Sequence, residues 1–361
     1  MFSFFKKNPP PSVLSLREMI EPLAQPLFQI EDIKISSSGT AIVVLQSLNL
    51  KQDTEKGRLY IEQVVSKIKG IKKANVILTG QREIEKKATL KPNQQIQGLP
   101  PIVIAVTSGK GGVGKSTVAV NLAIALSQLG KEIGILDADI YGPSLPRLLG
   151  VQNAKSEQGY DDRLEPILVH GLKAMSMGFL VPEETAMIWR GPMAQSALLQ
   201  MLRDVNWSGL DILVIDMPPG TGDIHLTLAQ RVPLSGGIVV STPQDIALID
   251  ARKGIEMFQK VAVPILGIIE NMSYYRCPKC GHQDNIFGHG GARAEAEKIG
   301  VSFLGEIPLH SLIRQTSDAG TPVTLSAIES EQAKAFQMIA EKIISGLSVT
   351  KRHPPTIRME D

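Results

Sequence analysis

The stretch that decides the fold is Gly109-Lys110-Gly111-Gly112-Val113-Gly114-Lys115-Ser116-Thr117. It matches G-x-x-x-x-G-K-[ST], follows the apolar run Ile102–Val106 and precedes the helical pattern Ser116–Leu129. Glycines let successive backbone N–H groups curve around a phosphate, and the N-terminus of the following helix adds a positive dipole. The sequence therefore predicts a nucleotide site in which Lys115 contacts the terminal phosphates and Ser116 offers a hydroxyl to magnesium.

On both sides of this loop, short and nearly continuous apolar runs alternate with amphipathic helical segments. This is the pattern of strands buried on both faces of a parallel sheet, so we expect a doubly wound, mainly parallel α/β domain. The expected strands are Ile102–Val106, Ile133–Leu136, Ile212–Ile215, Gly237–Ser241, Ile265–Ile269 and Val301–Leu304. The expected helices are Ser116–Leu129, Met193–Val205, Ile246–Val261, Ala292–Ile299 and Glu331–Leu347.

The residues before the loop predict a separate, smaller α/β module. Its expected elements are a helix at Ser12–Leu27 interrupted by Pro22 and Pro26, a hairpin of Ile30–Ile35 and Ala41–Leu45, a helix at Thr54–Lys69 and a strand at Ala74–Leu78. The expected domains are residues 1–80 as an accessory module, 81–100 as a polar linker, 101–350 as the P-loop ATPase domain and 351–361 as a flexible tail.

Composition excludes several classes of protein. Of 361 residues, 43% are hydrophobic and 20% are charged, which is typical of a globular chain and does not favour overall disorder. The net charge of +2 indicates no nucleic-acid partner. The apolar start is too short for a signal peptide, and no apolar window is long enough to span a membrane. We therefore expect a cytoplasmic protein without a membrane partner.

Three aspartates are expected at the same edge of the sheet as the loop. Asp137 and Asp139 follow the strand that ends at Leu136, while Asp216 ends a later strand and precedes the Gly- and Pro-rich segment 217–223. The carboxyl ends of parallel strands meet at one edge, so these carboxylates are expected near the phosphates. A flexible segment after such an aspartate is typical of a switch that responds to the γ-phosphate. Each aspartate is also compatible with a helix cap or a turn.

The chain has two cysteines, Cys277 and Cys280, separated by Pro278-Lys279 and followed by Gly281. This spacing predicts a knuckle-like turn that directs both sulfurs at one metal. A tetrahedral zinc ion or an iron–sulfur cluster needs four ligands, so a second copy of the chain would complete the set. A structural zinc knuckle within one chain remains an alternative. A thioredoxin-type redox pair fits less well because it opens a helix. His282 is expected at the rim of the site.

Lys110 is a second lysine that the ordinary motif does not require, and it marks the deviant Walker A subclass. The loop resembles those of the nitrogenase iron protein, the Min and Par positioning ATPases and the arsenite and tail-anchor targeting ATPases. The resemblance implies that Lys110 reaches the nucleotide of a dimer partner, that Asp139 positions the attacking water, that Asp137 lies near magnesium and that Asn271 hydrogen-bonds adenine. Lys110, Lys115, Asp139 and Asp216 are the catalytic residues it implies.

The Cys-x-x-Cys motif follows Asn271-Met272-Ser273, and the chain also contains Trp189-Arg190-Gly191-Pro192 and Asp139-Ile140-Tyr141-Gly142-Pro143-Ser144. With these motifs, residues 99–344 resemble the Mrp/ApbC family of iron–sulfur cluster carriers. The resemblance implies an ATP-hydrolysing homodimer that holds a labile, bridging [4Fe-4S] cluster and passes it to apoproteins. Its implied partners are apo iron–sulfur proteins and cluster-assembly scaffold proteins.

The N-terminal module resembles the small domain often fused to Mrp proteins, although Glu21-Pro22-Leu23 stands where Asp-Pro-Glu is usual. Two other functions keep the same nucleotide site. One is a Min- or Par-type positioning ATPase, which has no need of the cysteines. The other is a small-molecule kinase or ligase, which would bind no iron.

Overall fold

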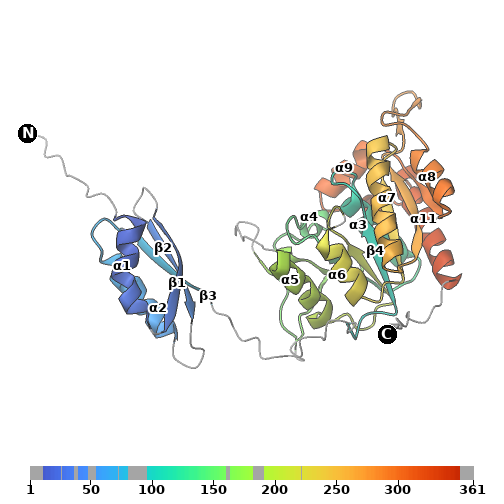
Figure 1. Ribbon diagram of the computed structural model, residues 1–361. Coiled ribbons are helices and arrows are strands. Elements are labelled where there is room, and N and C mark those ends of the chain that lie inside the picture. Colours follow the sequence, from blue (N-terminus) through green and yellow to red (C-terminus); the bar gives the residue numbers. More distant parts are fainter. Residues whose placement is uncertain are drawn as a thin grey trace, which may run out of the picture. The chain divides into compact units, whose positions relative to one another are not determined.

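The computed structural model describes residues 11–25, 27–35, 40–47, 54–71, 73–79, 96–159, 163–181, 191–220 and 222–349. The chain forms two compact units, residues 1–90 and 91–361, and several of their helices and strands are labelled in Figure 1. The expected linker lies outside the described residues as far as residue 95, and the expected tail lies wholly outside them. Among the described residues, no helix combines the length and the apolar character needed to cross a membrane.

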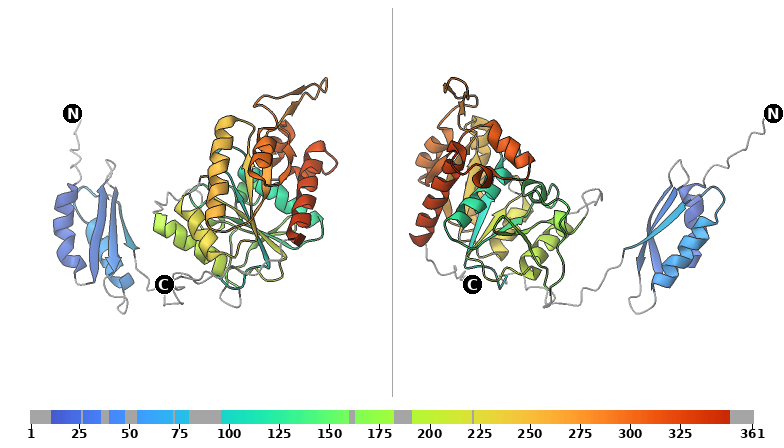
Figure 2. Two further views of the ribbon diagram at one scale, coloured as in Figure 1. Left: turned by 45° about the vertical axis from the view of Figure 1, so that its right-hand side comes forward. Right: turned by 180° about the vertical axis from the view of Figure 1, so that it is seen from behind.

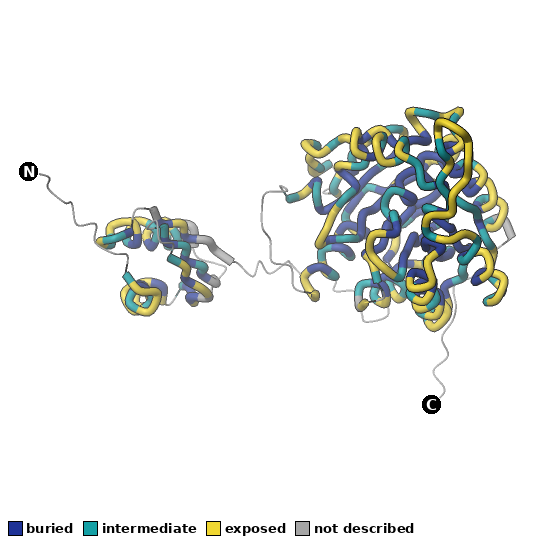
Figure 3. Tube along the Cα trace, turned by 90° about the horizontal axis from the view of Figure 1, so that it is seen from above, coloured by how far each residue is buried: buried dark blue, intermediate teal, exposed yellow. Residues whose placement is uncertain are grey.

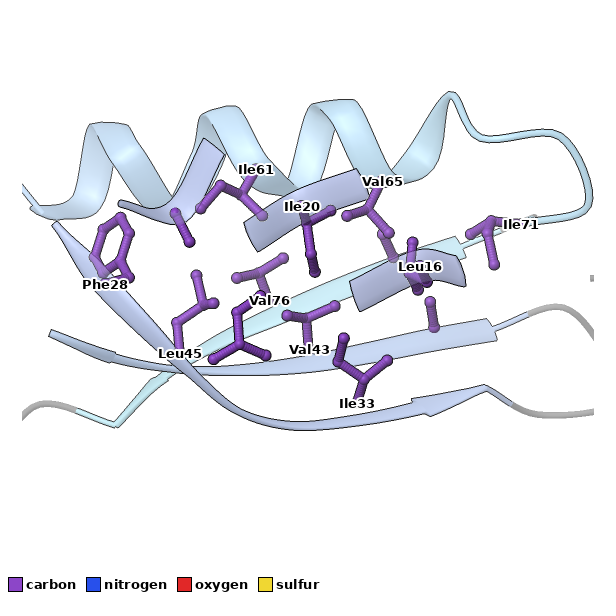
Figure 4. Packing of buried hydrophobic residues seen from close by; sticks show 14 residues of the cluster. Leu16, Ile20, Phe28, Ile33, Val43, Leu45, Ile61, Val65, Ile71 and Val76 are labelled. Carbon is purple, nitrogen blue, oxygen red and sulfur yellow. The ribbon is translucent and has the colours of Figure 1, made fainter. Parts of the chain in front are cut away.

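The N-terminal unit is a three-stranded sheet with two helices on one face. Its elements are α1 (Val13–Ala24), β1 (Phe28–Ile35), β2 (Thr40–Ser47), α2 (Thr54–Ser66) and β3 (Lys73–Thr79). The predicted hairpin is confirmed, because β1 pairs antiparallel with β2, and β3 adds in parallel on the other side of β2. Figure 4 shows the apolar core between helices and sheet, which includes Leu16, Ile20, Val43, Leu45, Ile61 and Val65.

Helix α1 corrects one expectation about this unit. The sequence predicted an interruption at Pro22, but the helix continues through Pro22 and ends at Ala24. Proline removes one N–H donor and crowds the carbonyl four residues earlier, which here belongs to the exposed Glu18. The helix is also held in place by burial of Leu16, Ile20 and Ala24. Pro26 lies outside the described residues.

The larger unit contains an eight-stranded sheet in the order β13-β10-β9-β4-β8-β5-β7-β6. The strands are β4 (Ile102–Thr107), β5 (Ile133–Asp137), β6 (Ile167–Val169), β7 (Leu172–Met175), β8 (Ile212–Asp216), β9 (Gly236–Ser241), β10 (Ile265–Asn271) and β13 (Phe303–Ile307). All pairings are parallel except that of β6 with β7. The predicted fold class is confirmed, although β6 and β7 were not predicted and β13 begins two residues later than expected.

Helices cover both faces of this sheet (Figure 2). Right-handed crossovers place α3 (Lys115–Gln128) and α7 (Asp245–Lys260) on opposite faces, because the chain moves in opposite directions along the sheet after β4 and after β9. Helix α11 (Glu331–Val349) packs on α3, and α8 (Gly291–Ile299) packs on α7. The other helical segments are α4 (Leu145–Leu148), η1 (Met177–Phe179), α5 (Gly191–Asp204), α6 (Asp223–Arg231), α9 (Ser311–Asp318) and α10 (Val323–Ser326).

The core of the larger unit determines where its functional residues emerge. Strands β5, β8 and β9 are buried along their whole length, and buried segments run through the interior in Figure 3. Burial on both faces explains their continuous apolar sequence. The phosphate loop, Asp137, Asp216 and Asn271 therefore all appear at the carboxyl edge of one rigid sheet.

Candidate functional site

The phosphate loop connects the end of β4 to the start of α3. Gly112 and Gly114 have φ values of +84° and +80°, in the left-handed region that favours glycine. At Gly109, an added Cβ would lie 2.0 Å from the backbone oxygen of Asp250. These positions explain why the loop is rich in glycine. The loop has the strand–loop–helix setting that the sequence predicted.

Lys115 and Asp216 form a buried ion pair beside this loop. Nζ of Lys115 lies 2.5 Å from Oδ1 of Asp216 and 3.1 Å from Oγ of Ser116. Lys115 is 7% exposed and Asp216 1%. A buried charge without a partner is costly, so Lys115 and Asp216 each supply the partner that the other needs. The structure thus brings together three of the predicted site residues.

Two buried carboxylates, Asp137 and Asp216, lie side by side at this edge of the sheet. Asp137 and Asp216 are register partners on adjacent strands. Burial, followed by the charge of Asp216, raises the pKa of Asp137 to about 7. Burial also raises the pKa of Asp216, against the lowering effect of Lys115. Carboxylate and hydroxyl oxygens are the ligands that Mg²⁺ prefers, so Ser116 and Asp216 fit a magnesium site. Asp137 would have to exchange a backbone hydrogen bond for the ion in order to join them.

Asp137 also organises the loop that follows it. Its Oδ1 accepts a hydrogen bond from the backbone N–H of Asp139 at 3.1 Å. Its Oδ2 accepts from the N–H groups of Ser144 and Leu145, at 2.9 and 3.1 Å. This carboxylate therefore holds the turn carrying Asp139, and its direct contact with magnesium stays a prediction. Asp139 is partly exposed and accepts from the N–H of Gly142 at 3.2 Å.

A cleft of about 720 Å³ opens beside Asp139. It is bounded by the turn after β5, the start of α5 and the segment that precedes and opens α6. Its lining residues are Asp139, Tyr141, Gly142, Gly191, Pro192, Gln195, Pro218, Pro219, Gly222, Ile224 and His225. Because the predicted switch segment forms one wall, a shift of that segment would change the space next to Asp139. Thr221 lies outside the described residues.

His225 is a residue of this region that the sequence reasoning missed. It is 1% exposed, its Nε2 lies 3.4 Å from Oγ1 of Thr107, and its Nδ1 has no hydrogen-bond partner among the described residues. Burial lowers its pKa to about 4, and the charge of Lys115 acts in the same direction. A neutral imidazole therefore joins α6 to the end of β4. The sequence feature that could have indicated His225 is its position as a lone histidine in the apolar stretch from Ile224 to Leu228.

Lys110 belongs to the phosphate loop, whereas Asn271 contacts the loop from the end of β10. Lys110 is exposed, so its role across a dimer stays a prediction. Asn271 is buried at the end of β10, and its Nδ2 donates to the backbone oxygen of Val113 at 2.8 Å. A Cβ at Gly114 would lie 2.4 Å from that same Nδ2. Asn271 thus braces the loop, and its contact with adenine stays a prediction.

The cysteines lie in a small hairpin formed by β11 (Tyr275–Arg276) and β12 (Gln283–Asp284). The N–H of Cys277 donates to the oxygen of His282, and the N–H of Gly281 donates to the oxygen of Cys277, both at 2.9 Å. Backbone N–H groups of Cys280 and then Lys279, followed by the Cys280 side chain, lower the pKa of the Cys277 thiol. The predicted tight turn is confirmed, with both thiols free and His282 exposed. The hairpin projects from the unit in Figures 1 and 2.

A second group of possible metal ligands lies below this hairpin. Glu270, His289 and Glu306 have ligand atoms within 4.8 Å of one another. Glu306 already pairs with Arg293 at 2.9 Å, while Glu270 accepts N–H and O–H donors through both oxygens. We interpret the group as a structural network, because these donors occupy the oxygens that a cation would need.

Residues 101–344 match the ParA family profile described as NUBPL iron-transfer P-loop NTPase. The chain is 52% identical over 277 residues to an "iron-sulfur cluster carrier protein" of Escherichia coli, covering 75% of each chain. It is 49% identical over 260 residues to "iron-sulfur cluster transfer protein NUBPL" of Mus musculus, covering 72% of this chain and 81% of the mouse protein. Trp189 and Arg190, the first two residues of the Trp189-Arg190-Gly191-Pro192 motif, lie outside the described residues.

Two solved structures show the same architecture. A nucleotide-binding protein of Archaeoglobus fulgidus in complex with ADP is 40% identical, with a TM-score of 0.57 over 65% of this chain and 91% of that chain. The cell division ATPase MinD of Pyrococcus furiosus is 24% identical, with a TM-score of 0.53 over 68% of this chain and 98% of that chain. The second similarity shows the fold alone.

Proposed function

The chain belongs to the NUBPL iron-transfer P-loop NTPase family, and from that premise we propose an ATP-hydrolysing carrier that holds an iron–sulfur cluster between two copies of itself. The observation that carries the proposal is the exposed hairpin with Cys277 and Cys280, which lies in the same unit as a complete phosphate loop. With Cys280 exposed and Cys277 partly exposed, the thiols are accessible to a donor and to an acceptor of a cluster, as transfer requires.

The nucleotide half of the proposed cycle follows from the buried charges. We propose that Lys115 exchanges its contact with Asp216 for one with the terminal phosphates, since a polyanion supplies more negative charge than one carboxylate. Ser116, Asp137 and Asp216 would hold magnesium, which when bound neutralises phosphate charge. Asp139, beside the cleft, would orient the attacking water, and the exposed Lys110 would reach the nucleotide of the second copy.

The cluster half requires a second copy because each chain supplies two sulfurs and a [4Fe-4S] cluster takes four. Large apolar side chains at the carboxyl edge support this arrangement. Tyr141, which lines the cleft beside Asp139, is 56% exposed, and Ile246 and Ile249, in the first turns of α7 after β9, are 58% and 49% exposed. Ile286, which follows the cysteine hairpin, is 53% exposed. A symmetric dimer across this edge would cover them and bring the two cysteine hairpins together.

The names of the similar proteins support the remaining parts of the proposal. A carrier or transfer protein implies delivery to apoproteins, so apo iron–sulfur proteins and cluster-assembly scaffolds are the proposed partners. Free thiols fit a reducing compartment, for which we propose the cytoplasm. We propose residues 1–80 as an accessory module, without assigning it a cluster ligand.

The proposal is tested by reconstituting the protein with iron and sulfide under anaerobic conditions. We expect about four iron and four sulfide per dimer, with broad visible absorption. Changing Cys277 or Cys280 to Ala should abolish this absorption, because each substitution removes two of the four shared ligands. Full cluster content in a monomer would contradict the bridging geometry. About one tightly bound zinc per chain, without colour, would instead indicate a structural knuckle.

A further inference from the structure

Glu270 is a fully buried acidic residue that the proposed nucleotide cycle does not use. It is the penultimate residue of β10, and its exposure is 0%. Its Oε1 accepts from Oγ of Ser273 at 2.6 Å and from the N–H of Gly290 at 2.9 Å. Its Oε2 accepts from the N–H of Ala292 at 2.7 Å. Burying a carboxylate costs free energy, which these three hydrogen bonds offset in part. The buried position of Glu270 therefore needs a structural or functional explanation.

The three donors lie at the two ends of the segment that carries the cysteines. Ser273 precedes the cysteine hairpin, whereas Gly290 and Ala292 follow it at the start of α8. The N-cap of α8 is Gly290, which has no side chain of its own to accept these N–H groups. Glu270 thus acts as the cap from another element, where its charge also complements the positive end of the helix.

Further bonds restrain the same base of the segment. The N–H of Ser273 donates to the oxygen of Ile307, and the N–H of Leu309 donates to the oxygen of Tyr274. His289 lies 3.2 Å from Glu306, which also pairs with Arg293. Glu270 differs from these groups because one side chain joins the entry of the segment to its exit.

The residue after Glu270 is Asn271, which braces the phosphate loop. Successive side chains of a strand point to opposite sides, so Glu270 reaches α8 while Asn271 reaches Val113. The end of β10 therefore contacts both functional regions with adjacent residues. Neither contact is visible in the sequence, because their partners lie 22 and 158 positions away.

We propose that Glu270 is a positioning residue for cluster binding: by joining the two ends of the cysteine segment, its carboxylate sets the geometry in which Cys277 and Cys280 are presented. The inference rests on the proposed function of these cysteines. It predicts that a change at Glu270 alters the lifetime and the spectrum of the cluster while the nucleotide site remains intact.

The test compares Glu270→Gln with Glu295→Gln, a matched control on α8. Glu295 is also a buried carboxylate, but it pairs with Arg252 of α7 and has no bond to either end of the cysteine segment. In Glu270→Gln, the cluster should be lost to an iron chelator about tenfold faster or more, the scale of effects on groups that orient metal ligands. Its visible circular dichroism should also change. Glu295→Gln should retain the wild-type lifetime and spectrum.

A second variant, Ser273→Ala, and a hydrogen-exchange measurement on cluster-free protein test the role of Glu270 independently. Ser273→Ala removes one donor and should give a smaller acceleration in the same direction. In cluster-free protein, hydrogen exchange of the Gly290 and Ala292 amides should rise in Glu270→Gln but not in Glu295→Gln. This measurement tests the role of Glu270 even if wild-type protein binds no cluster, an outcome that would overturn the proposed function instead. Equal cluster lifetimes in both glutamine variants, or unchanged exchange at the two amides, would overturn the inference.

Discussion

The nucleotide site and the cysteine hairpin belong to one unit, yet they are built in opposite ways. Residues of the nucleotide site come from the ends of β4, β5, β8 and β10, and Lys115 and Asp216 are almost completely buried. The cysteines come from one short hairpin, with Cys280 exposed and Cys277 partly so. The first site is assembled by a sheet, and the second is formed locally.

This difference indicates which site needs a second copy. Within one chain, Lys115 already neutralises Asp216, and the glycine loop already has its backbone geometry. We therefore expect a single chain to bind nucleotide. Two exposed sulfurs cannot complete a four-ligand site, so we expect cluster binding to depend on association. The predictions below separate these two behaviours.

The largest effect is expected for Lys115→Ala. Loss of charged hydrogen bonds to the phosphates should weaken ATP binding by about 3 kcal/mol or more, roughly a hundredfold, while the cluster content stays unchanged. Calorimetry measures the affinity. Asp216 is left buried without its partner, so Lys115→Ala combined with Asp216→Asn serves as a stability control. Wild-type affinity in the single variant would contradict the assigned role of Lys115.

A contribution of similar size to the loss of stability in acid is expected from His225 in the buried region. The folded pKa of His225 is about 4, below the ordinary 6.5, so between these values the unfolded chain binds a proton that the folded chain does not. The contribution of His225 to stability should therefore fall by at most about 3 kcal/mol as the pH drops from 6.5 towards 4. The raised pKa of Asp137 acts in the opposite direction over this range, so the effect of His225 is measured as a difference from the His225→Gln variant. Above pH 6.5 the contribution of His225 should be constant.

His225→Gln should remove this part of the acid sensitivity. Denaturant unfolding, followed by fluorescence of the buried Trp207, measures it at pH 7 and pH 4.5. His282→Gln, in the exposed cysteine hairpin, is the matched control and should keep the wild-type difference between the two pH values. The same difference in His225→Gln would show that other groups cause the acid sensitivity.

A smaller effect is expected for Lys110→Ala and Asp139→Ala. Both residues are assigned to the transition state of hydrolysis, so each change should slow ATP turnover by about tenfold or more and shift the ATP dissociation constant by less than about threefold. Steady-state phosphate release and calorimetry measure the two quantities. Lys131→Ala removes another exposed lysine of the unit and should leave both unchanged. Wild-type turnover in either test variant would show that its assignment is wrong.

The smallest effect is expected when the cysteines are changed and nucleotide binding is measured. Cys277→Ala should change the ATP affinity by less than about 0.4 kcal/mol, roughly twofold, because among the described residues the Cys277 thiol has no hydrogen bond to the phosphate loop. A loss similar to that of Lys115→Ala would mean that the hairpin supports the nucleotide site, and the contrast between the two regions would then be wrong.

Local sequence was sufficient for the strands of the large sheet that position the nucleotide site and for the tight turn of the cysteines, but not for helix α6 or for the short strands β11 and β12. Each expected strand of the larger unit is a continuous apolar run, because burial on both faces selects one kind of side chain. Strands β6 and β7 were missed because they have three and four residues, too few for a periodic signal. The end of β13 was missed because Gly305 and Glu306 interrupt its apolar pattern.

The glycines, the lysine and the paired cysteines could be recognised from the sequence alone because each motif is contiguous and its backbone geometry is local. The partners of the buried charges could not be recognised from the sequence alone. Lys115 lies 101 positions from Asp216, and Asn271 lies 158 positions from Val113. His225 and Glu270 gain their roles only from strands and helices distant in the chain. Side-chain periodicity specifies which face is buried, whereas the sheet order decides which buried groups meet, and that order depends on packing of the whole chain.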